Sequence, residues 1–184
     1  MSQRFFFLTV VLTLLLGAPA GAGQGSAPLD SLFQALRAAP DDVAAEPVEG
    51  RIWDVWLQHP DETLLAEMRS GVLSLNADDY PAALDAFDRV VARDPTYAEG
   101  WNKRASAHYM LGDYESAMND LRRALLLEPR HFGALATLGL VYLELDRPAA
   151  ALRAFDAALA INPHLPNLRR QAQSIRISAA GLAL

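Results

Sequence analysis

The 184-residue chain contains no cysteine. This absence excludes a disulfide framework, a thiolate metal site, a cysteine nucleophile and the lipid-modified cysteine of a bacterial lipoprotein. It also suits an oxidising compartment, where an unpaired thiol is a liability. The sequence lacks a basic excess as well, since 16 Lys and Arg stand against 22 Asp and Glu and the formal net charge is −6. Because there is no excess of cations to neutralise phosphates, we expect no nucleic-acid partner.

Patterns of catalytic and metal-binding residues are missing too. The sequence has no Gly-x-Ser-x-Gly, no phosphate loop and no His-Glu-x-x-His. The four histidines have no ligand spacing, and His59, His131 and His164 fall around expected loops. The Asp-Asp pairs at 41–42 and 78–79 lie at expected helix starts, where acids favour the positive end of the helix dipole. We therefore expect no enzymatic activity, no cofactor and no metal.

An apolar run that directly follows a positive charge lies near the N-terminus. Arg4 precedes an apolar stretch at residues 5–16, and small residues follow up to Ala22. This order is typical of a signal peptide, here residues 1–22, cleaved after Ala20 or Ala22. An uncleaved anchor is the alternative, but a membrane-spanning helix needs about 20 apolar residues. The pattern predicts an exported protein, periplasmic in a bacterium or otherwise secreted, with no stable membrane span after cleavage.

A fixed period of 34 residues governs the centre of the chain. Small, large apolar and proline positions each recur three times at this spacing: Ala83, Ala117 and Ala151; Phe87, Leu121 and Phe155; Pro95, Pro129 and Pro163. A period of this length is typical of stacked helical hairpins, because one hairpin cannot bury its apolar face alone. The units are residues 64–97, 98–131 and 132–165. Composition agrees, since 52% hydrophobic and 21% charged residues describe a globular chain.

These units resemble tetratricopeptide repeats. The middle unit has the family's pattern in Trp101, Tyr114, Ala117, Ala124 and Pro129, and the third has it in Leu135, Leu138-Gly139, Tyr142, Ala151, Phe155, Ala158 and Pro163. In the first unit Glu67 replaces the family's aromatic residue. The resemblance implies an all-α, right-handed solenoid of helical hairpins, in which small side chains allow the two helices of a hairpin to approach closely.

The remaining segments flank the three units. Residues 23–28 are expected to form a linker, and residues 29–60 an N-terminal helical pair that serves as a degenerate repeat or a cap. We expect Pro47 near the start of the second helix of that pair, because proline within a helix removes a hydrogen bond. Trp53 should pack against the first unit or remain exposed. Residues 166–184 are expected to form a C-terminal capping helix.

The resemblance also implies a binding surface. Members of the family hold partners in a concave groove lined by the first helix of each unit, and a few anchor residues dominate such binding. Carried over, the groove residues are Met68, Arg69, Val72, Asn102, Lys103, Ser106, Tyr109, Thr137 and Leu140. The alternative is that these residues form only the solvated inner face of a short solenoid. The family's clamp for a chaperone's C-terminal carboxylate is not matched, because Met68 and Val72 stand at its Lys and Asn positions.

The sequence thus predicts an exported adaptor or scaffold that binds a protein or peptide of the cell envelope. The alternative is a structural module that forms homo-oligomers through its helical ends or the region of Trp53.

Overall fold

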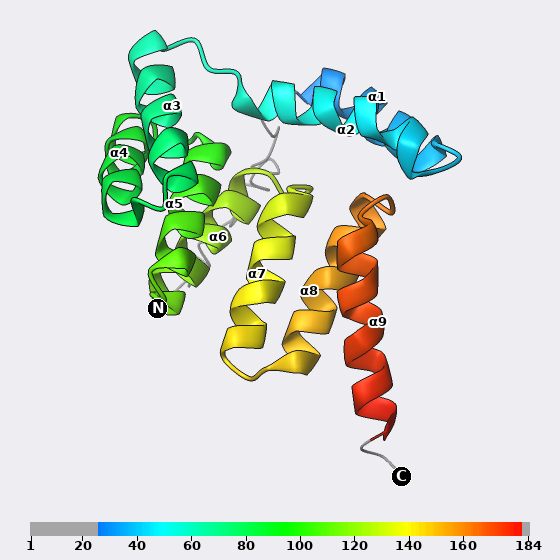
Figure 1. Ribbon diagram of the computed structural model, residues 1–184. Helices are drawn as coiled ribbons and strands as arrows, with labels where there is room; N and C mark the ends of the chain where they lie inside the picture. The colour runs from blue at the N-terminus through cyan, green and yellow to red at the C-terminus, as the bar shows by residue number, and fades with distance from the viewer. Residues whose placement is uncertain (1–25, 182–184) are drawn as a thin grey trace, which may run out of the picture.

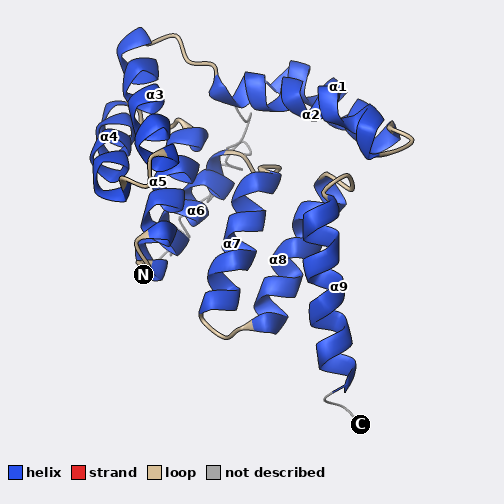
Figure 2. Ribbon diagram, in the orientation of Figure 1, coloured by secondary structure: helices blue, strands red, loops and turns tan. Residues whose placement is uncertain are grey.

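The computed structural model describes residues 26–181, and within that range the chain is entirely helical and loop (Figure 2). The predicted signal peptide and residues 23–25 of the predicted linker lie outside the described residues. The first helix begins at Ser26, so the last three residues of the predicted linker are helical. The helices are α1 (Ser26–Ala38), α2 (Asp42–Leu57), α3 (Glu62–Asn76), α4 (Tyr80–Arg93), α5 (Ala98–Met110), α6 (Tyr114–Leu127), α7 (Phe132–Glu144), α8 (Pro148–Ile161) and α9 (Pro166–Gly181).

Three helical hairpins, α3–α4, α5–α6 and α7–α8, stand in a row with α9 at the far end (Figure 1). The turns within the hairpins share one geometry, because Asp78, Gly112 and Asp146 occupy the same place in each unit and all have a positive φ, of 58°, 76° and 54°. The next residue caps the second helix in two units, where Asp79 and Asp113 accept from backbone amides. The all-α solenoid expected from the sequence is confirmed.

Close packing within each hairpin depends on small residues. Ala83, Ala117 and Ala151 are all fully buried. A Cβ added to Gly71 would lie 2.5 Å from the Phe87 ring, and one added to Gly139 would lie 2.2 Å from the Phe155 ring. The repeated small and aromatic positions are therefore the positions that join the helices of a hairpin, as the period predicts.

The N-terminal pair α1–α2 does not stack in front of α3. It lies across the edge formed by the three loops that follow the hairpins, two between hairpins and one between α8 and α9 (Figure 1). Helix α2 contacts each loop in turn: Tyr97 Oη donates to the Leu57 carbonyl at 3.3 Å, the Trp56 ring stacks on His131 at 4.1 Å, and Asn162 Nδ2 donates to Glu49 Oε2 at 2.9 Å. The predicted N-terminal helical pair is thus present, and its second helix bridges all three units along their loop edge.

Pro47 lies inside α2, five residues after its start, and not near the beginning as expected. The missing amide would have bonded to the carbonyl of Val43. Val43 lies in the first turn of α2, and the residue as a whole is 79% exposed. Water can take the place of the lost bond, which explains why the helix tolerates the proline.

Helix α9 closes the other end of the row. Its Leu168 and Ala172 are buried against the preceding hairpin. None of the described helices combines the length and the apolar character needed to cross a membrane.

Candidate functional site

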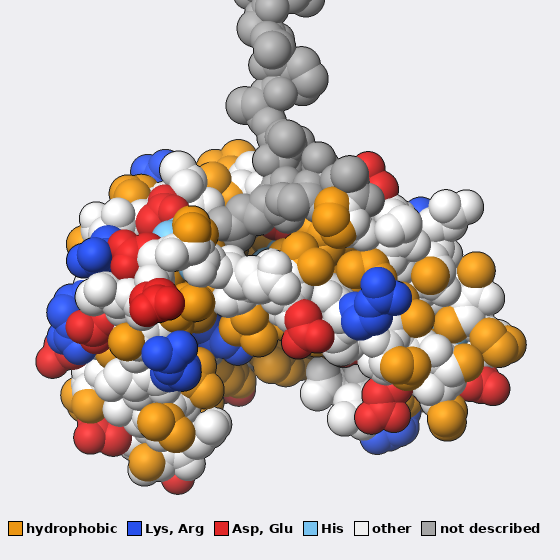
Figure 3. Space-filling model, turned by 90° about the horizontal axis from the view of Figure 1, so that it is seen from above, with side chains coloured by type: hydrophobic (Ala, Val, Ile, Leu, Met, Phe, Trp, Pro, Cys, Tyr) orange, Lys and Arg blue, Asp and Glu red, His pale blue; other side chains and the backbone are white. Residues whose placement is uncertain are grey.

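An apolar hollow lies beside α3. We call it the α3 hollow, with a volume of about 480 Å³ and a lining of Leu57, Leu65, Met68, Arg69, Val72, Leu73 and Tyr97. Its side chains come from α3, the end of α2 and the loop after α4. In the space-filling view from above, hydrophobic side chains are exposed in the indentation between the α1–α2 pair and the α3–α4 end of the molecule (Figure 3).

Helix periodicity produces this hollow. Residues three and four apart on α3 share a face, which brings Leu65, Met68, Arg69 and Val72 together. Met68 is buried at the base, whereas Leu65 and Val72 are only half-buried. Tyr97 is fully buried, and its bond to the Leu57 carbonyl fixes the end of α2 at the margin. Three of the predicted groove residues, Met68, Arg69 and Val72, thus meet in one concave surface.

Arg69 supplies the positive charge of the hollow. It is exposed, and among the described residues it forms no ion pair. The neighbouring cations of α4 differ, because Arg89 pairs with Glu67 at 2.8 Å and Arg93 pairs with Asp61. Their guanidinium groups hold the pKa values of both carboxyls below the ordinary range. Arg69 is therefore available to an acidic group from outside the chain.

A second, more polar hollow adjoins the first and shares Leu57 and Leu65 with it. Its polar side includes His59, whose Nε2 lies 2.9 Å from Asp94 Oδ2. Burial raises the pKa of Asp94, but hydrogen bonds from Thr96 and His59 lower it more, so the net pKa lies below its usual value. This hydrogen-bonded pair ties the loop before α3 to the loop after α4.

Asn102 and Lys103 belong to a buried network instead of an open groove. Its centre is Glu99, fully buried, which lies 2.7 Å from His131 Nε2. Asn102 Nδ2 donates to Glu99 at 3.0 Å, and Lys103 Nζ lies 3.2 Å from it. Burial raises the pKa of Glu99, but His131, Lys103 and Asn102 together hold it below its usual value. His131 Nδ1 accepts a hydrogen bond from the Ala134 amide at 3.1 Å. The ring proton is therefore on Nε2, which donates a hydrogen bond to Glu99.

Trp53 covers the concave side next to this network. Its ring packs edge-on against Phe132 at 5.4 Å, and Lys103 Nζ lies 5.8 Å from its centroid. A Cβ added to Gly133 would lie 2.6 Å from the same ring. The sequence suggested that Trp53 packs against the first unit or stays exposed, and the structure shows neither. Its ring lies against Phe132 and Gly133 at the start of the third unit and beside Lys103 of the second.

The other predicted groove residues are not brought together with the α3 hollow. Ser106 Oγ and Thr137 Oγ1 each donate to a carbonyl of their own helix at 3.1 Å. Tyr109 Oη donates to Glu144 at 3.4 Å, and Leu140 packs against the core that includes Phe132. The groove predicted over three units is thus split, and the open apolar part belongs to the first.

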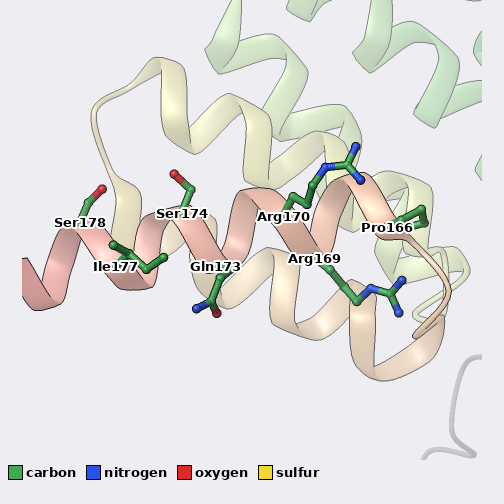
Figure 4. Close-up of a pocket in the computed structure, with 7 residues that line it drawn as sticks. All are labelled: Pro166, Arg169, Arg170, Gln173, Ser174, Ile177 and Ser178. Carbon is green, nitrogen blue, oxygen red and sulfur yellow. The ribbon is translucent and has the colours of Figure 1, made fainter.

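A different shallow depression lies along α9, lined by Pro166, Arg169, Arg170, Gln173, Ser174, Ile177 and Ser178 (Figure 4). All of these residues come from one helix, so nothing opposes them. Within residues 26–181 no three His, Cys, Asp or Glu side chains converge as a metal site would require.

Sequence reasoning missed the Glu99–His131 pair. A signal was present, because Tyr97, His131 and Leu165 occupy the last position of the three units and so point to one edge of the solenoid. That edge is the one that α2 covers.

Comparisons with known proteins agree with this architecture. The tetratricopeptide repeat model matches residues 98–131 and 132–165. A TPR repeat-containing protein of Rhizobium etli is 31% identical over 153 residues, which cover 83% of this chain and 75% of that protein.

Two solved structures are similar in fold. The first TPR of Spaghetti (RPAP3), bound to the HSP90 peptide SRMEEVD, has a TM-score of 0.62 and 20% identity, covering 65% of this chain and 94% of that one. The crystal structure of MamA has a TM-score of 0.61 and 19% identity, covering 80% of this chain and 84% of MamA. At these identities the likeness concerns the fold alone. Together with the relative from Rhizobium, the three phased hairpins establish that the chain belongs to the tetratricopeptide repeat family.

Proposed function

We propose that this protein is an adaptor that binds a segment of another protein in the α3 hollow. Tetratricopeptide repeats indicate a protein–protein interaction module, and proteins of this fold are typically scaffolds without enzymatic activity. The observation that supports this particular site is an apolar concave surface with half-buried Leu65 and Val72, which carries Arg69, a cation that forms no ion pair with the residues the structure describes.

The chemistry of the hollow indicates the segment it would bind. Burying one aliphatic side chain there contributes about 1.5–3 kcal/mol, so two apolar anchors would contribute about 3–6 kcal/mol before the cost of association. An acidic residue beside the anchors would pair with Arg69. A chaperone tail is disfavoured, because Met68 and Val72 replace the Lys and Asn of the family's carboxylate clamp.

Export to the cell envelope is a second part of the proposal. It is supported by the charged residue, apolar stretch and small residues of the first 22 positions. N-terminal sequencing of the protein from fractionated native cells tests it. We expect a mature chain that begins after Ala20 or Ala22 in the envelope fraction, and an intact N-terminus in the cytosol would contradict export.

Site-specific photo-cross-linking in the native cells tests the binding site. A photoreactive residue at Val72 should cross-link to a defined protein, and Arg69→Glu should weaken that product. The matched control is a photoreactive residue at Leu126, which is 65% exposed on α6. If both positions capture the same proteins, or if Arg69→Glu leaves the Val72 product unchanged, the α3 hollow is not the site.

A further inference from the structure

Among residues 26–181, no helix covers the side of α3 that faces away from α5. We call Ala66, Ser70 and Leu73 the α3 outer face; these are the third, seventh and tenth residues of their unit. Leu73 is 69% exposed, whereas the tenth residues of the next units, Ala107 and Val141, are fully buried. The same position is thus core in two units and surface in the first.

The preceding hairpin explains the difference. A Cβ added to Gly100, the third residue of its unit, would lie 2.8 Å from Val90 and 3.5 Å from Val91 of α4. Unit one has no hairpin before it, because α1–α2 lies across the loop edge. The α3 outer face is therefore a surface of the kind that this fold buries against another helix.

We propose that the α3 outer face pairs with the same face of a second copy of this chain, through an antiparallel contact about a two-fold axis. With the axis between Arg69 and Ser70, Leu73 of each copy lies opposite Ala66 of its mate. A large side chain then meets a small one twice, which is the self-complementarity that a two-fold interface requires. The two Ser70 side chains lie close together near the axis.

Size and charge favour this occupant. Helices pack with their axes about 8–10 Å apart, and the smaller distances require small residues such as Ala66 and Ser70 at the contact. None of the three residues is charged, although the chain carries a net charge of −6. These three residues therefore add no like-charge repulsion between the copies. Leu73 also lines the α3 hollow, together with Arg69 and Val72, so a second copy and a bound segment would compete for Leu73.

The opposite end of the row does not offer a matching surface. The outward side of α9 exposes Arg169, Arg170 and Gln173, with Ile177 as its large apolar residue. Head-to-tail stacking of copies would bury these polar groups against Leu73. A contact between two α3 outer faces avoids that cost and closes after two copies.

Sedimentation velocity of the purified full chain tests the proposal. A contact of one helix on one helix belongs to the weak class of interfaces, so the series should run from about 1 µM to about 1 mM. We expect a monomer–dimer equilibrium. Leu73→Glu removes two buried leucines per dimer and should raise the dissociation constant about 100-fold. Leu126→Glu, at a leucine of similar exposure on α6, should leave it unchanged.

Because the chain has no cysteine, one engineered thiol maps the axis directly. Ser70→Cys should form a disulfide-linked dimer under mild oxidation with copper phenanthroline, and Ser178→Cys on α9 should not. A monomer at every concentration, or equal cross-linking by both variants, overturns the proposal and leaves the face to a helix of another protein. Val72→Glu separates this proposal from the adaptor function, since it alters the α3 hollow and should leave the dimer intact.

Discussion

Replacing Trp56 with alanine should destabilise the whole molecule and not only its N-terminal pair. Trp56 is 1% exposed and lies between Phe33, Trp53, His131 and Phe132, with ring centroids 4.1–6.0 Å away. Truncating a buried Trp to Ala costs about 3–5 kcal/mol. Within residues 26–181 its indole N–H donates to no acceptor, and removing an unsatisfied group offsets part of the loss. We therefore expect a decrease of about 3 kcal/mol in the free energy of unfolding.

Urea denaturation followed by circular dichroism at 222 nm measures this change. Stacked repeats ordinarily interact only with their neighbours, but α2 contacts the loops of all three units. We expect one cooperative transition with an earlier midpoint. Val43→Ala, at a residue of the same helix that is 79% exposed, should change the stability by less than about 0.5 kcal/mol. A loss below about 1 kcal/mol for Trp56→Ala, or a separate first transition, would refute the bridging role of α2.

Three further predictions concern packing, pH and the buried network. Gly139→Ala should destabilise the fold by at least about 1–3 kcal/mol, because its Cβ would meet the Phe155 ring. Gly50→Ala has open space around it and should stabilise α2 by about 0.5–1 kcal/mol. Thermal unfolding measures both changes. The pKa of Glu99 is lower in the folded state, so its contribution is present above the unfolded pKa of about 4.3 and is lost as the pH falls through the folded value. The free energy of unfolding, measured from neutral to acidic pH, should therefore decrease in acid. The decrease should be smaller in Glu99→Gln, which has no carboxyl group to titrate at this position. Asn102→Ala should lower the melting temperature and leave the cross-link at Val72 in place, because Asn102 bonds to Glu99 within the chain. Loss of the cross-link in a fully folded variant would show that Asn102 belongs to the binding site.

The repeated positions made most of the fold predictable. Ala83 and Phe87, with their counterparts in the next units, recur because each hairpin needs the same close contacts, and those contacts appear in the structure. A period is visible in one sequence without knowledge of long-range contacts. That is why the solenoid could be predicted.

The path of α1–α2 could not be predicted in the same way. It depends on single contacts between residues far apart in sequence, such as Glu49 with Asn162, and no local pattern announces them. The same contacts decide which groove residues are free. Asn102 and Lys103 resemble binding residues by position, but Glu99 and Trp53 engage them within the chain.

The affinity of the partner segment identified by cross-linking tests the central claim most directly. Isothermal titration would compare the unmodified chain with Val72→Glu in the α3 hollow and with Tyr109→Ala in the groove of the second unit. If the α3 hollow binds the segment, Val72→Glu weakens binding at least about tenfold, because a charge replaces a buried apolar contact, and Tyr109→Ala has no effect. Unchanged binding by Val72→Glu together with a loss in Tyr109→Ala would contradict the account.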